Sequence, residues 1–231
     1  MINIKNLNQF YGQSHTLWDL NLQIEKARCT CLMGRNGVGK TTLAKAIMGL
    51  LPIKNGQIIY ENKDISKLGS EKRAGLGIGY VPQGREIFSQ LTVKENLEIG
   101  LLGNRNGLKQ VPDKIYQLFP VLKDMLKRKG GDLSGGQQQQ LAIGRALCLE
   151  PKLLILDEPS EGIQPNIVQQ IGGVIDYLTK EEKITVILVE QKLPFARKYG
   201  DDFYLLERGN VVAKGEIEDL SDEIVEQYLS V

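Results

Sequence analysis

The stretch Cys29-Thr30-Cys31-Leu32-Met33-Gly34-Arg35-Asn36-Gly37-Val38-Gly39-Lys40-Thr41-Thr42 decides the fold of this chain of 231 residues. An apolar run of strand character leads into the pattern Gly-x-x-x-x-Gly-Lys-Thr, and the residues after it read as a helix. This strand–GxxxxGK[ST]–helix arrangement is a phosphate-binding loop and indicates a nucleoside triphosphate as the ligand. The alternative is a glycine-rich turn that matches by accident, which the flanking strand and helix disfavour.

Each residue type in this loop suits contact with phosphate. The glycines let the backbone curl so that its amide hydrogens point inward, next to the positive end of the following helix. We expect Lys40 to neutralise the β- and γ-phosphates of ATP and the hydroxyl of Thr41 to reach Mg²⁺. The loop residues expected to bind the nucleotide are Gly34, Arg35, Asn36, Gly37, Val38, Gly39, Lys40, Thr41 and Thr42.

The composition argues against several other classes of protein. Lys plus Arg number 29 and Asp plus Glu number 28, so the basic excess of a dedicated nucleic-acid binder is missing. A local basic run at Lys123 and Lys127–Lys129 is interpreted as a solvated helix end. The odd number of cysteines, 3, indicates free thiols in a reducing compartment. No signal peptide or membrane-length apolar run is present in the sequence, so we expect a soluble cytosolic protein.

Strand-length apolar runs alternate with helical stretches along most of the chain, which favours an α/β fold with a largely parallel central sheet. Ile2–Leu7 and Asn21–Ile24 have no helix between them and are expected to form a small antiparallel layer. The other strands are expected at Cys29–Met33, Gln57–Tyr60, Ile78–Pro82, Leu153–Asp157, Thr185–Val189 and Phe203–Leu206.

The strand pattern disappears between about residues 91 and 149. Helices are expected there at Val93–Leu102, Asp113–Leu118, Val121–Lys127 and Ser134–Leu149. We interpret 91–149 as a helical subdomain inserted into a nucleotide-binding core made of 1–90 and 150–231. The last stretch, Glu216–Val231, is expected to hold one short helix and no regulatory domain.

Two acids follow the apolar strand Leu153–Asp157. Ligands of α/β proteins bind at the carboxyl ends of buried parallel strands, where these acids would lie. Asp157 fits the acidic partner of Mg²⁺ in phosphate-loop enzymes, and Glu158 fits the group that orients or deprotonates the attacking water. An ordinary polar loop is the alternative, and the phosphate loop upstream disfavours it.

A second anion-binding feature lies at Leu133-Ser134-Gly135-Gly136-Gln137. Ser134 is a good N-cap, and the glycines expose the first amides of the long helix that follows. With the later sequence Leu153-Leu154-Ile155-Leu156-Asp157-Glu158-Pro159, this motif makes the chain resemble the ATP-binding-cassette (ABC) ATPases. The resemblance covers nearly the whole chain, and the pair of motifs is highly specific.

The resemblance implies roles for residues outside the phosphate loop. Ser134, Gly135, Gly136 and Gln137 would close in trans on the γ-phosphate held by Lys40 of a second subunit. A head-to-tail dimer would thus sandwich the ATP. Tyr11 matches the aromatic residue that stacks on adenine, with a packed core position as the alternative. Gln83 matches the glutamine that touches Mg²⁺ and water, with an ordinary loop amide as the alternative.

The chain departs from the family pattern in two places. Ser160–Pro165 occupies the position of the dimer-contact loop, but Glu161 and Gly162 differ from the usual residues. The switch histidine that contacts the γ-phosphate is replaced by Gln191, and the only histidine, His15, lies far upstream. Our hypothesis is that Gln191 contacts the γ-phosphate as a neutral donor while Glu158 serves as the base. His15 is expected to be a surface or packing residue.

The segments Gly77–Phe88, Leu91–Leu97 and Leu188–Gln191 resemble the ATPases of branched-chain amino acid and amide importers. Within that group the chain looks most like the urea-importer subunit, on four segments: Ser14–Leu20, Cys29–Asn36, Gln137–Gln140 and Val189–Ala196.

This resemblance implies several partners and a location. The partners are a second copy or a related ABC ATPase, two integral membrane permease subunits and an external solute-binding protein. The location is the cytoplasm, peripheral on the inner face of the plasma membrane. The membrane partner is expected near Gln83–Leu97, where Ile87 and Phe88 are candidate contacts, with packing inside the helical lobe as the alternative.

Three other functions were weighed against an importer. ATPases of the lipopolysaccharide-export type usually keep the switch histidine, whereas this chain has Gln191 at that position. Soluble cassette ATPases of DNA repair carry long coiled coils or basic faces. A module that binds ATP without cleaving it is disfavoured because Lys40, Thr41, Asp157 and Glu158 are all present.

Overall fold

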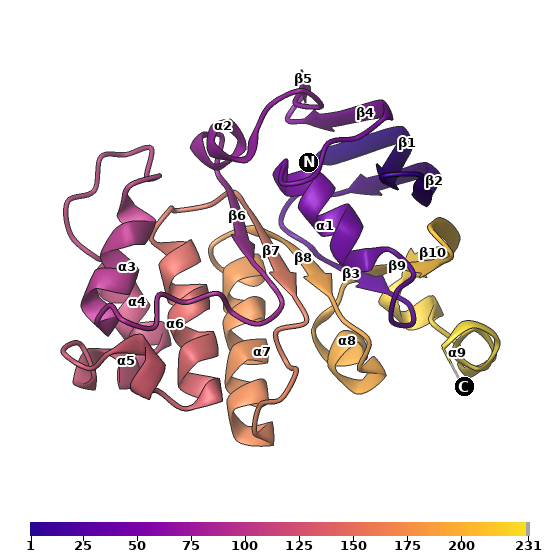
Figure 1. Ribbon diagram of the computed structural model, residues 1–231. Coiled ribbons are helices and arrows are strands. Elements are labelled where there is room, and N and C mark those ends of the chain that lie inside the picture. Colours follow the sequence, from indigo (N-terminus) through magenta and orange to yellow (C-terminus); the bar gives the residue numbers. More distant parts are fainter. Residues whose placement is uncertain (230–231) are drawn as a thin grey trace.

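The computed structural model describes residues 1–229, which form two sheets flanked by helices (Figure 1). A four-stranded sheet has the order β2-β1-β4-β5, and a six-stranded sheet has the order β10-β9-β3-β8-β7-β6. The strands are β1 (Ile2–Tyr11), β2 (Ser14–Ile24), β3 (Cys29–Met33), β4 (Asn55–Tyr60), β5 (Lys63–Asp64), β6 (Ile78–Val81), β7 (Leu153–Asp157), β8 (Thr185–Val189), β9 (Asp202–Glu207) and β10 (Asn210–Glu216).

The six-stranded sheet is parallel except for β10, which pairs antiparallel with β9. Every residue of β3, β7 and β8 is buried, as expected for parallel strands covered on both faces. The predicted α/β fold with a mostly parallel sheet is therefore confirmed. The prediction missed β10, an edge strand whose residues are at best half-buried and whose apolar run, Val211–Ala213, is only three residues long.

The predicted antiparallel layer is also confirmed, but its strands are longer than predicted. β1 continues past Leu7 to Tyr11, and β2 begins at Ser14. The register of β1 against β2 shifts between Ile4 and Leu7, and Asn6 has a φ of 47°. This bulge breaks the apolar–polar alternation of the strand, so the sequence pattern ended too early.

The helices are α1 (Lys40–Met48), α2 (Ser70–Gly75), α3 (Val93–Leu101), α4 (Asp113–Leu118), α5 (Pro120–Asp124), α6 (Gly135–Leu147), α7 (Pro165–Lys180), α8 (Leu193–Tyr199) and α9 (Asp222–Tyr228). The four helices predicted within 91–149 are present, but α5 ends at Asp124 because the backbone of Met125 leaves the helical region. A short 3₁₀ turn, Ile217–Asp219, and then α9 occupy the last predicted segment, of which residues 230–231 lie outside the described part. No helix of residues 1–229 has the length and apolar character to cross a membrane.

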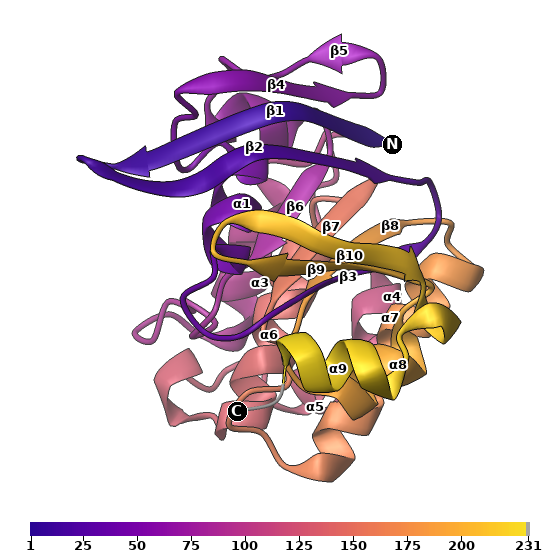
Figure 2. The ribbon, with the colours of Figure 1, turned by 90° about the vertical axis from the view of Figure 1, so that its right-hand side faces the viewer.

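Two buried clusters cover the two faces of the parallel sheet. Side chains of α1, such as Leu43, pack with both sheets in one cluster, and Figure 2 shows the four-stranded sheet as a separate layer above the strands of the other. The second cluster joins Leu97 of α3 and Leu141 of α6 to Leu154 of β7. Helices α3–α6 thus share a continuous core with the sheet, and their division from it at residues 91 and 149 remains a proposal.

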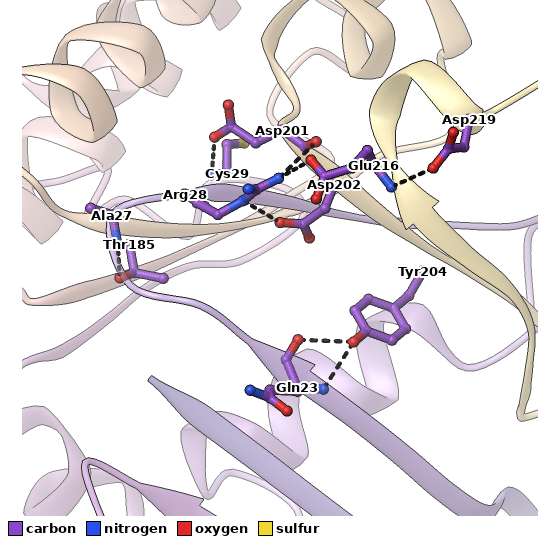
Figure 3. Close-up of polar contacts among 10 residues, drawn as sticks. All are labelled: Gln23, Ala27, Arg28, Cys29, Thr185, Asp201, Asp202, Tyr204, Glu216 and Asp219. Carbon is purple, nitrogen blue, oxygen red and sulfur yellow. Dashed lines mark hydrogen bonds and ion pairs between the residues drawn. The ribbon is translucent and has the colours of Figure 1, made fainter.

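Partly buried and exposed polar contacts lie at the amino-terminal ends of the parallel strands and between the two sheets (Figure 3). The guanidinium of Arg28 donates to the carboxylate of Asp202 at 2.9 Å and also reaches Glu216. The hydroxyl of Tyr204 in β9 accepts from the N–H of Gln23 at 3.0 Å and donates to its carbonyl at 2.9 Å, which ties the two sheets together. These contacts hold the amino-terminal ends of the strands in place. The carboxyl-terminal ends of the same strands can then present side chains at defined positions.

Candidate nucleotide-binding site

The loop between β3 and α1 has the backbone of a phosphate cradle. Gly34, Gly37 and Gly39 have φ values of 142°, 79° and 110°, a region that other residues rarely adopt. A Cβ on Gly34 would collide with the carbonyl oxygen of Leu206, and one on Gly39 would lie 2.7 Å from a methyl carbon of Leu17. The predicted need for glycine in this loop therefore has two physical causes, conformation and close packing.

Lys40 lies buried at the start of α1, with 4% of its surface exposed. Its ammonium donates to the carbonyl oxygens of Gly34 and Arg35 at 2.8 and 2.9 Å and lies 3.9 Å from Oε1 of Glu158. Burial lowers the pKa of Lys40, while Glu158 and nearby carboxylates act in the opposite direction. A positive charge is thus held inside the curve of the loop. An anionic phosphate bound there would offset the cost of burying this charge.

Asp157 ends β7 beside this lysine. Its carboxylate accepts from the hydroxyl of Thr41 at 3.1 Å and from the hydroxyl of Tyr80 at 3.2 Å. Burial raises the pKa of Asp157, and those hydrogen bonds oppose the rise. The position of Asp157 next to Thr41 agrees with the metal-binding roles expected for both residues.

Glu158 follows with a left-handed backbone, φ 49°, which turns its side chain out of the strand direction. Oε2 of Glu158 accepts from the amide of Gln83 at 3.1 Å and from the amide of Gln191 at 3.4 Å. Burial raises the pKa of Glu158, and the charge of Lys40 opposes this change. A carboxylate with a raised pKa, held by two amides next to a phosphate loop, is suited to general-base chemistry.

Several of these residues line one cavity, while Gly34 and Asp157 lie outside its lining. Its volume is about 250 Å³, and its lining consists of Asn36, Gly37, Gly39, Lys40, Thr41, Thr42, Gln83 and Glu158. Residues that are distant in sequence, such as Thr42, Gln83 and Glu158, are therefore brought together as expected. Gln191 reaches the cavity wall through its contact with Glu158.

The segment Ser134–Gln137 forms a different structure, the capped start of α6. The hydroxyl of Ser134 accepts from the N–H of Gln137 at 3.4 Å, and the side chain of Gln137 accepts from the N–H of Ser134 at 2.9 Å. This is a capping box. Within residues 1–229, no hydrogen bond joins this segment to the phosphate loop, and its expected role at phosphate in trans stays a prediction.

Two aromatic residues of the β1–β2 hairpin also lie near the loop. Tyr11 is 49% exposed, and its hydroxyl is 3.5 Å from that of Thr42, so it is not a core residue. His15 stacks on Phe10 with ring centroids 4.0 Å apart, and its Nε2 lies 2.9 Å from Oδ1 of Asn8. His15 is therefore a packing residue, as predicted.

Sequence reasoning missed Tyr80, Ser160 and Glu190 at this edge. Tyr80 was assigned only to a strand, yet β6 pairs with β7 and carries the hydroxyl to Asp157. Glu190 is buried and accepts from the hydroxyl of Ser160 at 2.7 Å. The available signal was an acid directly after the apolar run Thr185–Val189, the same pattern that identified Asp157 and Glu158.

Comparison with known proteins agrees with this site. A family model described as ABC transporter matches residues 17–161. The high-affinity branched-chain amino acid transport ATP-binding protein BraG of Pseudomonas aeruginosa is 41% identical, and the match covers 92% of this chain and 91% of that protein. The probable branched-chain amino acid transport ATP-binding protein LivF of Archaeoglobus fulgidus is 37% identical, with coverage of 95% and 94%.

Solved structures give the same result for the fold. A nucleotide-free ATP-binding cassette from an ABC transporter superposes with a TM-score of 0.83 at 29% identity, covering 100% of this chain and 95% of the other. A dimeric cassette in a post-hydrolysis state, bound to ADP and Pi, superposes with a TM-score of 0.84 at 25% identity, covering 94% and 99%.

Replacing Lys40 with Ala should weaken ATP binding by about ten- to hundredfold, because the loop loses the buried ammonium that lies inside its curve. Isothermal titration with ATP measures this change. The matched control is Lys63→Ala, an exposed lysine of β5, which should bind ATP like the original protein. Equal affinity of the two variants for ATP would contradict the phosphate-loop assignment.

Proposed function

This chain belongs to the ABC transporter family, and we propose that it powers an importer of branched-chain amino acids. Members of the family bind ATP and hydrolyse it to ADP and phosphate, and this chain has that activity. The observation that carries the proposal is the strong similarity to BraG over nearly the full length of both chains. Similarity of this extent, together with a complete phosphate site, favours a transport ATPase over a soluble cassette or an ATP-holding module.

For the reaction, we propose a division of roles within the cavity. The loop amides and the ammonium of Lys40 bind the β- and γ-phosphates. Oε1 or Oε2 of Glu158 takes the proton from the attacking water, and the amides of Gln83 and Gln191 fix that carboxylate in place. Gln191 donates to the γ-phosphate as a neutral group, so no proton of a switch histidine enters the cycle.

Mg²⁺ fits the donor set, and we propose that Thr41, Gln83 and Asp157 hold it. The oxygens of Thr41 and Asp157 lie 3.1 Å apart, and hard oxygen donors are those that Mg²⁺ prefers. Among residues 1–229, no group of three or more His, Cys, Asp or Glu could hold a metal by itself. When bound, the ion would supply charge neutralisation at the phosphates.

We propose that the working unit is a dimer, either of two copies or with a related ABC ATPase. One solved structure similar to this chain is a dimer of a bacterial ABC transporter cassette. In our proposal Ser134, Gly135, Gly136 and Gln137 of one subunit face the phosphates bound by Lys40 of the other. The exposed ring of Tyr11, beside Thr42, would stack on adenine.

The proposed membrane contact is a groove between the sheet and helices α3 and α6. It has a volume of about 510 Å³ and is lined by apolar residues that include Leu50 and Phe88. These two side chains are 49% and 47% exposed, which supports docking of a permease helix. Ile87 is half-buried and packs against the cluster that contains Leu97 and Leu141, which favours the alternative of packing inside the helical lobe for this residue.

This docking would place the protein in the cytoplasm, on the inner face of the plasma membrane. The complete importer would then contain two integral membrane permeases and an external solute-binding protein. Residues 91–149 would act as the helical subdomain that links the nucleotide site to the permease, through the Gln83 loop.

Urea is the second candidate solute, favoured by the four sequence segments that resemble urea-importer subunits, such as Ser14–Leu20. The names of BraG and LivF favour branched-chain amino acids instead.

The solute can be tested in a reconstituted assembly of this ATPase with its permeases and binding protein. Leucine, isoleucine or valine should raise the ATP hydrolysis rate severalfold over the basal rate, while urea should not. Stimulation by urea alone would overturn the amino acid proposal and leave the ATPase assignment intact.

Replacing Glu158 with Gln should lower ATP hydrolysis by about a hundred- to thousandfold while ATP still binds, because the base is lost and its shape is kept. An ATP-bound dimer should then accumulate, which size-exclusion chromatography with light scattering detects. The control Glu182→Gln changes a carboxylate that pairs with Lys114 away from the cavity and should leave turnover unchanged. Unchanged turnover in Glu158→Gln would rule out the assigned role.

A further inference from the structure

Glu190 is a buried acid for which the proposed reaction has no use. It follows β8 directly and is 1% exposed. Among residues 1–229 it forms no ion pair with Lys, Arg or His within 4.0 Å. Its charge acts on Lys40 only at longer range. A buried carboxylate without a direct ion pair is costly unless its oxygens accept several hydrogen bonds, so its hydrogen-bond partners should reveal its task.

The partners of Glu190 come from two different loops. Oε2 accepts from the hydroxyl of Ser160 at 2.7 Å, and Ser160 belongs to the loop that follows Glu158. Oε1 accepts from the backbone N–H groups of Gln191 and Lys192, both at 2.9 Å. One side chain therefore holds the backbone of the Gln191 loop and the start of the dimer-contact loop at a fixed separation.

Two further hydrogen bonds join the loop after β7 to β8 and the loop after it. The ammonium of Lys192 donates to the carbonyl of Ser160 at 2.8 Å, and the N–H of Glu158 donates to the carbonyl of Val189 at 2.9 Å. The loops after β7 and β8 are thus joined on both sides of the Glu158 side chain. Gln191 points from this joined structure to Glu158.

We propose that Glu190 is a positioning residue that holds the amide of Gln191 against Glu158. This proposal rests on the proposed roles of Glu158 and Gln191 in hydrolysis. The distance from Nε2 of Gln191 to Oε2 of Glu158 is 3.4 Å, at the long end of hydrogen-bond geometry. A small displacement of the loop would break this hydrogen bond, so in our proposal the length of the Glu190 side chain decides whether the bond forms.

Two substitutions of Glu190 separate length from charge. Glu190→Gln keeps the length: its carbonyl oxygen can accept from the two backbone N–H groups, and its amide can donate to the hydroxyl of Ser160. Glu190→Asp keeps the charge but is shorter by one carbon–carbon bond, about 1.5 Å. It cannot reach Ser160 and the backbone amides of the Gln191 loop together without moving that loop.

We expect Glu190→Gln to retain kcat within about threefold of the original protein. Glu190→Asp should lower kcat by about ten- to hundredfold, the size of effect that a displacement of about 1 Å produces at a catalytic group. The KM for ATP should change little in either variant, because the phosphate loop is not touched. A steady-state ATPase assay gives both constants.

A double-mutant cycle tests the route through Gln191. Gln191→Ala should be slow, and Glu190→Asp combined with Gln191→Ala should be no slower than Gln191→Ala alone, because the two residues act as one unit. Full activity of Gln191→Ala would show that the proposed role of Gln191 has failed. A slow Gln191→Ala together with a fully active Glu190→Asp would show that only the inference about Glu190 has failed.

Folding of each variant is checked by its thermal unfolding midpoint and its affinity for ATP. Glu182→Asp shortens a carboxylate outside the cavity and serves as the matched control, with unchanged kcat. If Glu190→Asp does not fold, Ser160→Ala removes one partner of Glu190 and should lower kcat severalfold at unchanged KM. The inference is overturned if Glu190→Asp or, in its place, Ser160→Ala keeps full kcat, if Glu190→Gln is the slower of the two Glu190 variants, or if KM changes in place of kcat.

Discussion

Burial of opposite charges at the carboxyl end of the parallel sheet is the constraint on which the site depends. The ammonium of Lys40 lies 3.9 Å from the carboxylate of Glu158, and both side chains are nearly inaccessible to water. Burial lowers the pKa of Lys40 and raises those of Asp157 and Glu158, so each charge is costly and each partly offsets the others. Such a site gains from a ligand that brings its own negative and positive charges, as ATP with a divalent ion does.

Two neutral side-chain amides donate hydrogen bonds to the carboxylate of Glu158 in this site. Gln83 and Gln191 approach one oxygen of Glu158 from different loops, and Gln83 also donates to Glu161, in the loop that follows Glu158, at 2.9 Å. The segments after β6, β7 and β8 are thereby connected through hydrogen bonds to one carboxylate. The loop that holds Gln83 continues to Phe88 at the apolar groove. One loop thus adjoins both Glu158, the proposed base, and the surface proposed for the permease.

Much of this could be predicted from sequence because the signals are local. The phosphate loop, the acids after Leu153–Leu156 and the capped start of α6 each depend on a few adjacent residues. β7 and β8 were predicted with their observed bounds because strands buried on both faces are continuous apolar runs. The start of α6 was likewise found one residue from its observed position.

Pairings that depend on strand order could not be predicted. Nothing in the sequence near Tyr80 indicates that β6 lies beside β7, which is what brings its hydroxyl to Asp157. The contact of Glu190 with Ser160 likewise requires β7 and β8 to be neighbours. The full length of β1 and the edge strand β10 were not predicted for a different reason. The bulge in β1 and the sequence of β10 do not keep the apolar–polar alternation that identifies a strand.

The pH dependence of kcat/KM for ATP tests most directly whether burial at the sheet edge makes Glu158 the base. The deprotonated carboxylate is the active form, so activity should be lost as the pH falls through the raised pKa of Glu158. ATP binding measured at each pH separates this loss from protonation of the nucleotide. The account predicts an inflection above the ordinary glutamate pKa of about 4.3 that is absent in Glu158→Gln. A rate that stays constant down to that ordinary value, or an unchanged inflection in Glu158→Gln, would contradict it.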